Sequence, residues 1–185
     1  TDAHTLAQYK LEKVLGIDTK DPTKSLIFYN EEMNNHAENY AAFVLEQLEK
    51  AKKSCTDPQL LIEQKLGFSR HVPEGYGHVD CLIIADGTLT VIDYKYGLGI
   101  KVSAEKNPQM FCYALGGLAL FDGIYDIDNI HLVIYQPRRE NISEFNISKS
   151  ELIKWAEEVL APTAQLAIKG EGEYSRKRVS VDAAP

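Results

Sequence analysis

The sequence predicts an α/β protein with a mixed central β-sheet and flanking α-helices. Helix-like segments precede and follow a group of apolar, strand-like segments, which gives the order α, α, β, β, β, α, β, α. The length of 185 residues suits one domain, and a hydrophobic share of 44% is enough for a sizeable core. We therefore expect a single domain over residues 1–170 and a loose tail over residues 171–185, where no apolar period is visible.

The composition narrows the classes of function. Charged residues make up 25% of the chain, as in an ordinary soluble protein, and no apolar run approaches the roughly 18 residues of a membrane helix. Three cysteines without a C-x-x-C pair argue against a disulfide framework or a zinc site, so we expect a cytoplasmic protein with no membrane contact. The net charge of −7 alone predicts no nucleic-acid partner, because such partners usually leave a basic footprint.

Two helices open the chain. Residues 1–16 predict the first, because their apolar side chains fall near one face and Gly16 suits the end of a helix. Residues 26–53 predict the second, because apolar side chains recur at a spacing of three or four from Met33 to Leu48. Each helix therefore has one apolar stripe with which to cover a sheet.

Three strand-like segments follow a turn at residues 54–58. The first lies near residues 60–69 and alternates between apolar and polar side chains. The next two form a hairpin over residues 77–96, because Asp86-Gly87 between two apolar runs is among the strongest short hairpin signals. These segments predict the centre of the sheet.

The rest of the chain completes the sheet and its cover. A helix is expected from about residue 107 to residue 121, since Pro108 is tolerated in the first turn of a helix. A strand follows over residues 129–137. One helix or two then occupy residues 148–170, with Pro162 marking a kink.

The predicted hairpin carries three charged residues, although buried charge is costly unless it is paired or bound to a metal. If the turn has two residues, Ala85 pairs with Thr88, and the same register places Asp80 directly opposite Asp93. Directly opposed side chains have Cβ atoms about 4.5–5.5 Å apart, so the two acids would repel each other without a positive charge between them. Lys95 lies two residues beyond Asp93 and therefore shares its face.

Two carboxylates at this separation form a hard oxygen site, which suits Mg²⁺ or Mn²⁺. Such an ion polarises a phosphoryl oxygen and lowers the pKa of bound water. Lys95 would then stabilise developing negative charge or orient the attacking water. The alternative is a structural ion pair between Lys95 and one aspartate at a strand end, and the geometry alone leaves both interpretations open.

These residues resemble the core motif of the PD-(D/E)XK nuclease superfamily. The resemblance is closest to its RecB-type branch, including the CRISPR-associated RecB-like exonucleases and a phage-encoded group. The core pattern is an Asp at the end of a Gly-containing stretch, then a hairpin, then an acid, any residue and a Lys. Here the pattern is Gly77-His78-Val79-Asp80, twelve residues, and Asp93-Tyr94-Lys95.

The RecB-type branch adds a Gln-x-x-x-Tyr motif and a His on an N-terminal helix. Gln109 and Tyr113 match the first, and their spacing places them on one helical face. His4 matches the second. The resemblance implies a restriction-endonuclease-like core and a metal site for Mg²⁺ or Mn²⁺ at His4, Asp80, Asp93 and Tyr94. It implies catalytic roles for Asp80, Asp93, Lys95, Gln109 and Tyr113.

The function implied by the resemblance is a metal-dependent DNA nuclease, more an exonuclease than an endonuclease. Its partners would be single-stranded DNA or duplex ends, with phage or host recombination and defence proteins as further candidates. The net negative charge is compatible with this if the cleft is locally basic, and Lys101, Lys106, Arg138 and Arg139 could touch phosphates. Many RecB-type members carry a C-terminal cysteine cluster that binds an iron–sulfur centre. Here no cysteine follows Cys112, so we expect no iron–sulfur cluster in this chain.

Two other functions remain open at this point. The chain could be a non-catalytic nucleic-acid-binding or adaptor module in a phage or defence complex, although the intact Asp80, Asp93 and Lys95 argue against a dead enzyme. It could also be a structural protein with a chance Asp-x-Lys, which the separate Gln-x-x-x-Tyr disfavours.

Glu63, in the strand before the hairpin, is either one more carboxylate of the site or a solvent-facing residue.

Overall fold

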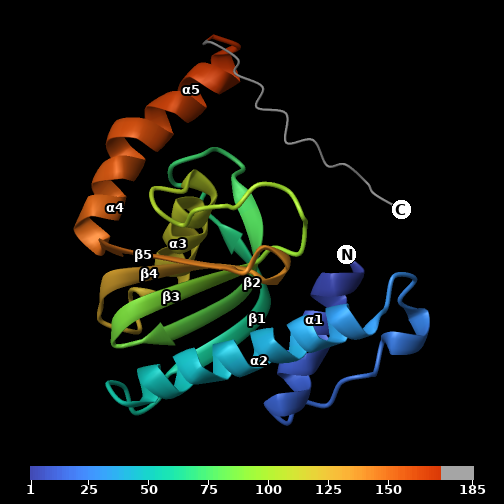
Figure 1. The fold of residues 1–185 in the computed structure, drawn as a ribbon. Helices are drawn as coiled ribbons and strands as arrows, with labels where there is room; N and C mark the ends of the chain where they lie inside the picture. Colours follow the sequence, from blue (N-terminus) through green and yellow to red (C-terminus); the bar gives the residue numbers. More distant parts are fainter. Residues whose placement is uncertain (172–185) are drawn as a thin grey trace.

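The computed structural model describes residues 1–171, so nearly all of the tail predicted over residues 171–185 lies outside the described residues. Its centre is one five-stranded sheet in the order β1-β2-β3-β4-β5 (Figure 1). Neighbouring strands are antiparallel except β3 and β4, which are parallel. The strands are β1 Gln59–Gly67, β2 Tyr76–Ala85, β3 Gly87–Tyr94, β4 Ile127–Gln136 and β5 Asn141–Ser148. The predicted mixed sheet with flanking helices is confirmed.

Helices cover both faces of the sheet (Figure 1). The first two, α1 Asp2–Val14 and α2 Glu31–Lys52, pack on one face, and α3 Pro108–Phe121 packs on the other. The second helix begins later than the predicted residue 26. The reason is local, because the Asn30 side chain accepts the backbone N–H of Met33 and so caps the helix at that point.

The edge strand β5 is absent from the sequence prediction. Its inner side chains Phe145 and Ile147 pack on the core, but Ile142 is exposed, so the apolar pattern is irregular. A short 3₁₀ turn and the left-handed Glu140, with φ of 47°, reverse the chain after β4. Pairing with β4 along its whole length then fixes this half-polar segment as a strand, a case of tertiary context overriding local pattern.

The C-terminal helical segment is divided as Pro162 predicts. It consists of α4 Lys149–Trp155, a π-helical turn over Ala156–Leu160 and α5 Ala161–Lys169. Proline has no N–H to bond to the preceding turn, which accounts for the irregular turn directly before it. None of the helices in the described part of the chain is both long enough and apolar enough to cross a membrane.

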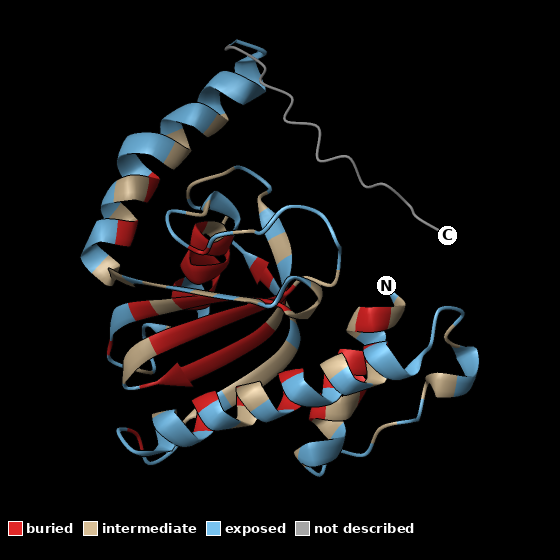
Figure 2. Ribbon diagram, viewed as in Figure 1, coloured by how far each residue is buried: buried red, intermediate tan, exposed pale blue. Residues whose placement is uncertain are grey.

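Two hydrophobic cores lie on opposite faces of the sheet, and the central strands are buried on both sides (Figure 2). The core beneath α3 includes Leu82, Leu89, Val91 and Met110. The larger members of the core beneath α1 and α2 are Leu6, Leu11, Tyr40, Val44, Ile83, Ile92 and Tyr94. Burial on both faces explains the nearly continuous apolar runs of the hairpin.

The alternation of side chains reverses at one level of β1 and β2. Val79 belongs to the α3 core, whereas Cys81, two residues on, belongs to the α1/α2 core. In β1, Ile62 pairs with Cys81 and Gln64 with Val79, so Glu63 and Asp80 stand at the level where both strands change face. Glu63 has a φ of 50°, a left-handed conformation that only a local distortion of a strand requires. This distortion sets the directions of the two acidic side chains.

Candidate metal centre at the end of the central strands

Asp93 lies at the end of β3, Lys95 directly follows the strand, and the two side chains contact each other. Asp93 is only 5% exposed, and Lys95 Nζ lies 2.7 Å from its Oδ2 atom. The contact lacks hydrogen-bond geometry, so this carboxylate oxygen has a charged neighbour but no hydrogen-bond donor. A buried carboxylate with an unsatisfied oxygen beside a positive charge is poised to accept a further partner.

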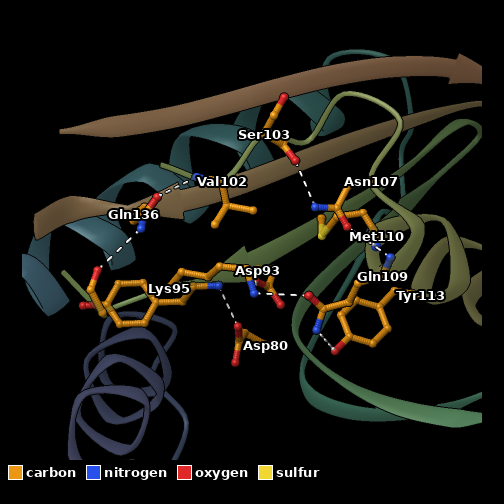
Figure 3. Close-up of polar contacts among 12 residues, drawn as sticks. Asp80, Asp93, Lys95, Val102, Ser103, Asn107, Gln109, Met110, Tyr113 and Gln136 are labelled. Atoms are coloured by element: carbon orange, nitrogen blue, oxygen red, sulfur yellow. Dashed lines mark hydrogen bonds and ion pairs between the residues drawn. The ribbon is translucent and has the colours of Figure 1, made fainter. Parts of the chain in front are cut away.

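A chain of polar contacts extends from Lys95 to α3 (Figure 3). Lys95 Nζ donates a hydrogen bond of 3.2 Å to Gln109 Oε1, and Gln109 Nε2 donates one of 2.8 Å to the Tyr113 hydroxyl. The structure therefore brings together Asp93, Lys95, Gln109 and Tyr113, which the sequence placed in separate segments.

The position of α3 depends on its first turn and on one glycine. Asn107 caps the helix, because its side chain accepts the backbone N–H groups of Gln109 and Met110. The ring of Tyr113 lies on Gly77 of β2, and a Cβ built there would stand 2.5 Å from Tyr113 Cε1. The glycine of the Gly-x-x-Asp stretch is thus required for close approach of the helix.

The neighbouring loop is held by the buried side chain of Gln136 at the end of β4. Its amide oxygen accepts the N–H of Val102 at 3.1 Å, and its amide nitrogen donates to the carbonyl of Ile100 at 3.1 Å. These bonds fix the segment between Lys95 and Asn107, which is also visible in Figure 3. Gln136 thereby ties the loop that leads from Lys95 to α3 to the end of β4.

Asp80 lies beside Asp93, but the two are not a regular cross-strand pair. The predicted register holds from Ala85↔Thr88 to Cys81↔Ile92, where the β2–β3 ladder ends. One residue further on, Asp80 Oδ2 instead accepts the backbone N–H of Tyr94 at 2.6 Å. The regular ladder therefore ends one pair before Asp80 and Asp93, and the expected pairing of these two residues does not form.

Burial raises the pKa of Asp80 to about 7, and the negative charge of Asp93 adds to this effect. The Tyr94 N–H and the charge of Lys95 oppose it. Such a carboxyl is readily ionised by a nearby cation. A raised pKa is expected where two acidic side chains lie close together and water has little access to them.

His4 reaches the same place from α1. Its ring meets the ring of Tyr94 edge-on with centroids 5.5 Å apart, and its Nδ1 atom lies 2.5 Å from the Thr1 hydroxyl. Burial lowers the pKa of His4 below its ordinary value, which favours the neutral imidazole that binds metals. His4, Asp80 and Tyr94 all line one small cavity.

Glu63 is a member of this neighbourhood that sequence analysis left undecided. It lines the cavity with His4 and Asp80, and its negative charge contributes to the raised pKa of Asp80. The pairing of β1 with β2 brings Glu63 to the site, because it places residue 63 level with residue 80. That pairing could not be read from the sequence, because the connecting loop is longer and carries no strong turn signal.

The residues supply suitable donors for a hard divalent cation, although they are not gathered around one point. Within residues 1–171 no three His, Cys, Asp or Glu side chains stand close enough together to form a ready-made metal centre. Asp93 is drawn to Lys95 and Asp80 to the Tyr94 amide, as expected for like charges that separate. A buried carboxylate with an unsatisfied oxygen, Asp93, and a half-buried one, Asp80, nevertheless fit Mg²⁺ or Mn²⁺ in chemistry.

A solved structure shares the fold of this chain. A "Putative exonuclease" from Eubacterium rectale aligns with a TM-score of 0.51 and 12% identity, covering 97% of this chain and 72% of that one. At this identity the likeness shows a shared fold and nothing more. A second structure, SSO0001, covers 93% of this chain and 88% of its own at 14% identity, but its TM-score of 0.28 carries no argument.

The family assignment is firmer, because it rests on the sequence itself. Residues 1–179 match the family described as "Protein of unknown function (DUF2800)". The match includes every residue of the candidate site, from His4 in α1 to Tyr113 in α3. The chain therefore belongs to the DUF2800 family.

Proposed function

We propose that the protein is a metal-dependent DNA nuclease of the RecB type that hydrolyses phosphodiester bonds as an exonuclease. The observation that carries the proposal is the burial of Asp93, 5% exposed, against Lys95 and next to a second, half-buried carboxylate, Asp80. A sheet end needs no such charges for stability, since apolar side chains of similar volume would serve as well. Titratable groups kept at this cost are typical of functional sites.

Two further observations support the proposal. The polar chain from Lys95 to Gln109 and Tyr113 joins both motifs that the RecB-type resemblance requires. A protein described as a "Putative exonuclease" shares the fold. The exonuclease mode rests on these analogies, whereas the hydrolytic chemistry rests on the site itself.

Asp80 and Asp93, with His4 and Tyr94 beside them, are the residues that would hold Mg²⁺ or Mn²⁺. When bound, the ion would supply a polarised phosphoryl oxygen and a more acidic water. Lys95 cannot ligate a cation, and its ammonium instead meets the negative charge that grows on the phosphate. Gln109 orients the ammonium group of Lys95 by accepting a hydrogen bond from it. Gln109 is held in turn by its own hydrogen bond to the Tyr113 hydroxyl.

The test is cleavage of end-labelled linear DNA, single-stranded and duplex, with Mg²⁺ or Mn²⁺. Asp93→Asn should abolish cutting while the protein stays folded. Asp122→Asn is the matched control, because Asp122 makes a 2.9 Å ion pair with Lys149 on the surface. A parent protein that cuts neither substrate but retards DNA on a gel would refute the nuclease and support a non-catalytic nucleic-acid-binding module.

A further inference from the structure

The cavity behind Asp80 contains two side chains that the proposed chemistry does not use. It lies on the α1/α2 side of the sheet, and the residues around it include His4, Tyr40, Glu63 and Asp80. Tyr40 comes from the middle of α2 and Glu63 from the middle of β1. Tyr40 is therefore held by a regular helix, and Glu63 by the local distortion of β1 beside the candidate centre.

The hydroxyl of Tyr40 is buried without a partner. Tyr40 is 2% exposed, and its hydroxyl makes no hydrogen bond to any of the residues that the structure describes. Buried phenols usually find a partner, so an unsatisfied one calls for an explanation. Burial raises the pKa of Tyr40 well above its ordinary value, and the nearby acids add to this, so the hydroxyl remains a hydrogen-bond donor.

Glu63 adopts a backbone conformation that is unusual for a strand. Its φ of 50° lies in the left-handed region, whereas the other non-glycine residues of residues 1–171 with positive φ lie in turns or next to them. Strain of this kind persists where the surroundings impose it, and it clusters at functional sites. At this distorted position Glu63 adjoins the same cavity as Tyr40.

We propose that Tyr40 and Glu63 are positioning residues for the attacking water. The Tyr40 hydroxyl donates a hydrogen bond to the water oxygen, and the Glu63 carboxylate accepts one from a water hydrogen. A water molecule with two lone pairs and two hydrogens keeps one lone pair for the cation or the phosphorus under this arrangement. The inference rests on the proposed nuclease function and adds to it the place where the water is held.

The central test is Tyr40→Phe, which removes the hydroxyl and nothing else. The kcat for DNA cleavage should fall about tenfold, as expected for one lost hydrogen bond, while KM for DNA and Mn²⁺ affinity by calorimetry stay unchanged. The melting temperature should not fall, because no partner is left unpaired. Glu63→Gln, which keeps the volume, should lower kcat as well.

A matched control separates this role from ordinary stabilisation. The Tyr125 hydroxyl donates a 2.8 Å hydrogen bond to the Asp57 carbonyl, remote from the site. Tyr125→Phe should therefore lower the melting temperature and leave kcat at the parent value. The double variant Tyr40→Phe/Glu63→Gln should be about as slow as the slower single variant, because both residues would act on one water.

Several results would overturn the inference. Tyr40→Phe could cut at the parent rate, or it could lose as much melting temperature as Tyr125→Phe does. The two single effects could also multiply in the double variant, which would show independent roles. In each case the parent still cuts DNA, so the proposed function survives. A parent that does not cut removes both proposals together.

Discussion

Lys95 touches a carboxylate on one side and an amide on the other, so its removal should separate binding from chemistry. In Lys95→Ala, Mn²⁺ binding measured by calorimetry should persist or tighten, because a competing positive charge 2.7 Å from Asp93 is gone. DNA affinity should stay close to that of the parent, since one phosphate contact is a small part of the total. The cleavage rate should fall by about 10²–10³. Loss of Mn²⁺ binding would indicate instead that Lys95 holds Asp93 in place structurally.

Asp80 should make the metal-free protein less stable as pH rises. Its pKa is about 7 in the folded chain against an ordinary value of 3.8, so the folded state binds more protons than the unfolded state between these values. The unfolding free energy therefore falls as pH increases through this window. Asp80→Asn keeps an oxygen for the Tyr94 N–H, so in EDTA it should melt above the parent at pH 8 and close to it near pH 4.

The surface variant Asp122→Asn is the control for this pH effect, since it removes a carboxylate from an exposed ion pair. Its melting temperature should follow that of the parent at both pH values. A large loss of stability in Asp80→Asn at pH 8 would contradict the argument. It would mean that the ionised carboxylate stabilises the fold, as in the structural ion-pair interpretation.

Among the elements, α3 depends on β2 for its position. Gly77→Ala would place a Cβ against the Tyr113 ring, so the ring must move and disturb the contact from Gln109 to Lys95. We expect a clear loss of cleavage with only a modest fall in melting temperature. Gly67→Ala is the control, because a Cβ there meets nothing within 4 Å. Equal cleavage by both variants would show that α3 tolerates the shift.

The elements also show what a sequence can and cannot reveal. The register of the hairpin was predictable, because the Asp86-Gly87 turn fixes it from Ala85↔Thr88 to Cys81↔Ile92. The extension to Asp80 failed, because the regular ladder ends one pair before Asp80 and Asp93. Strand β5 was not predicted, because half of its side chains are polar. It forms a strand because it pairs with β4.

At the scale of the whole molecule, the α/β class and the mixed sheet followed from the order of elements. The roles suggested here for Tyr40 and Glu63 did not, because they depend on the reversal of alternation in β1 and β2 and on the packing of α2 across it. Neither feature leaves a periodic trace in the chain. Tyr40 in particular looks like any other member of the apolar stripe of its helix.

Binding of the cation should stabilise the entire fold. At a Mn²⁺ concentration of 100 times Kd, mass action adds about 2.7 kcal/mol to the free energy of unfolding. For a chain of this size each kcal/mol corresponds to about 2–4 °C, so the melting temperature should rise by about 5–10 °C. EDTA should reverse the rise, and Asp80→Ala and Asp93→Ala should lack it. A rise of the same size in both variants would place the binding elsewhere.

The candidate site takes its groups from three strands of the sheet, β1, β2 and β3, and from α1 and α3, which cover opposite faces of it. These elements lie far apart along the chain. No local segment can assemble it, so the entropy of closing long loops must be overcome before the groups meet. We infer that the site appears late in folding, when α1 docks and brings His4 to Tyr94. If the chain cuts DNA as proposed above, a partly folded chain should not do so.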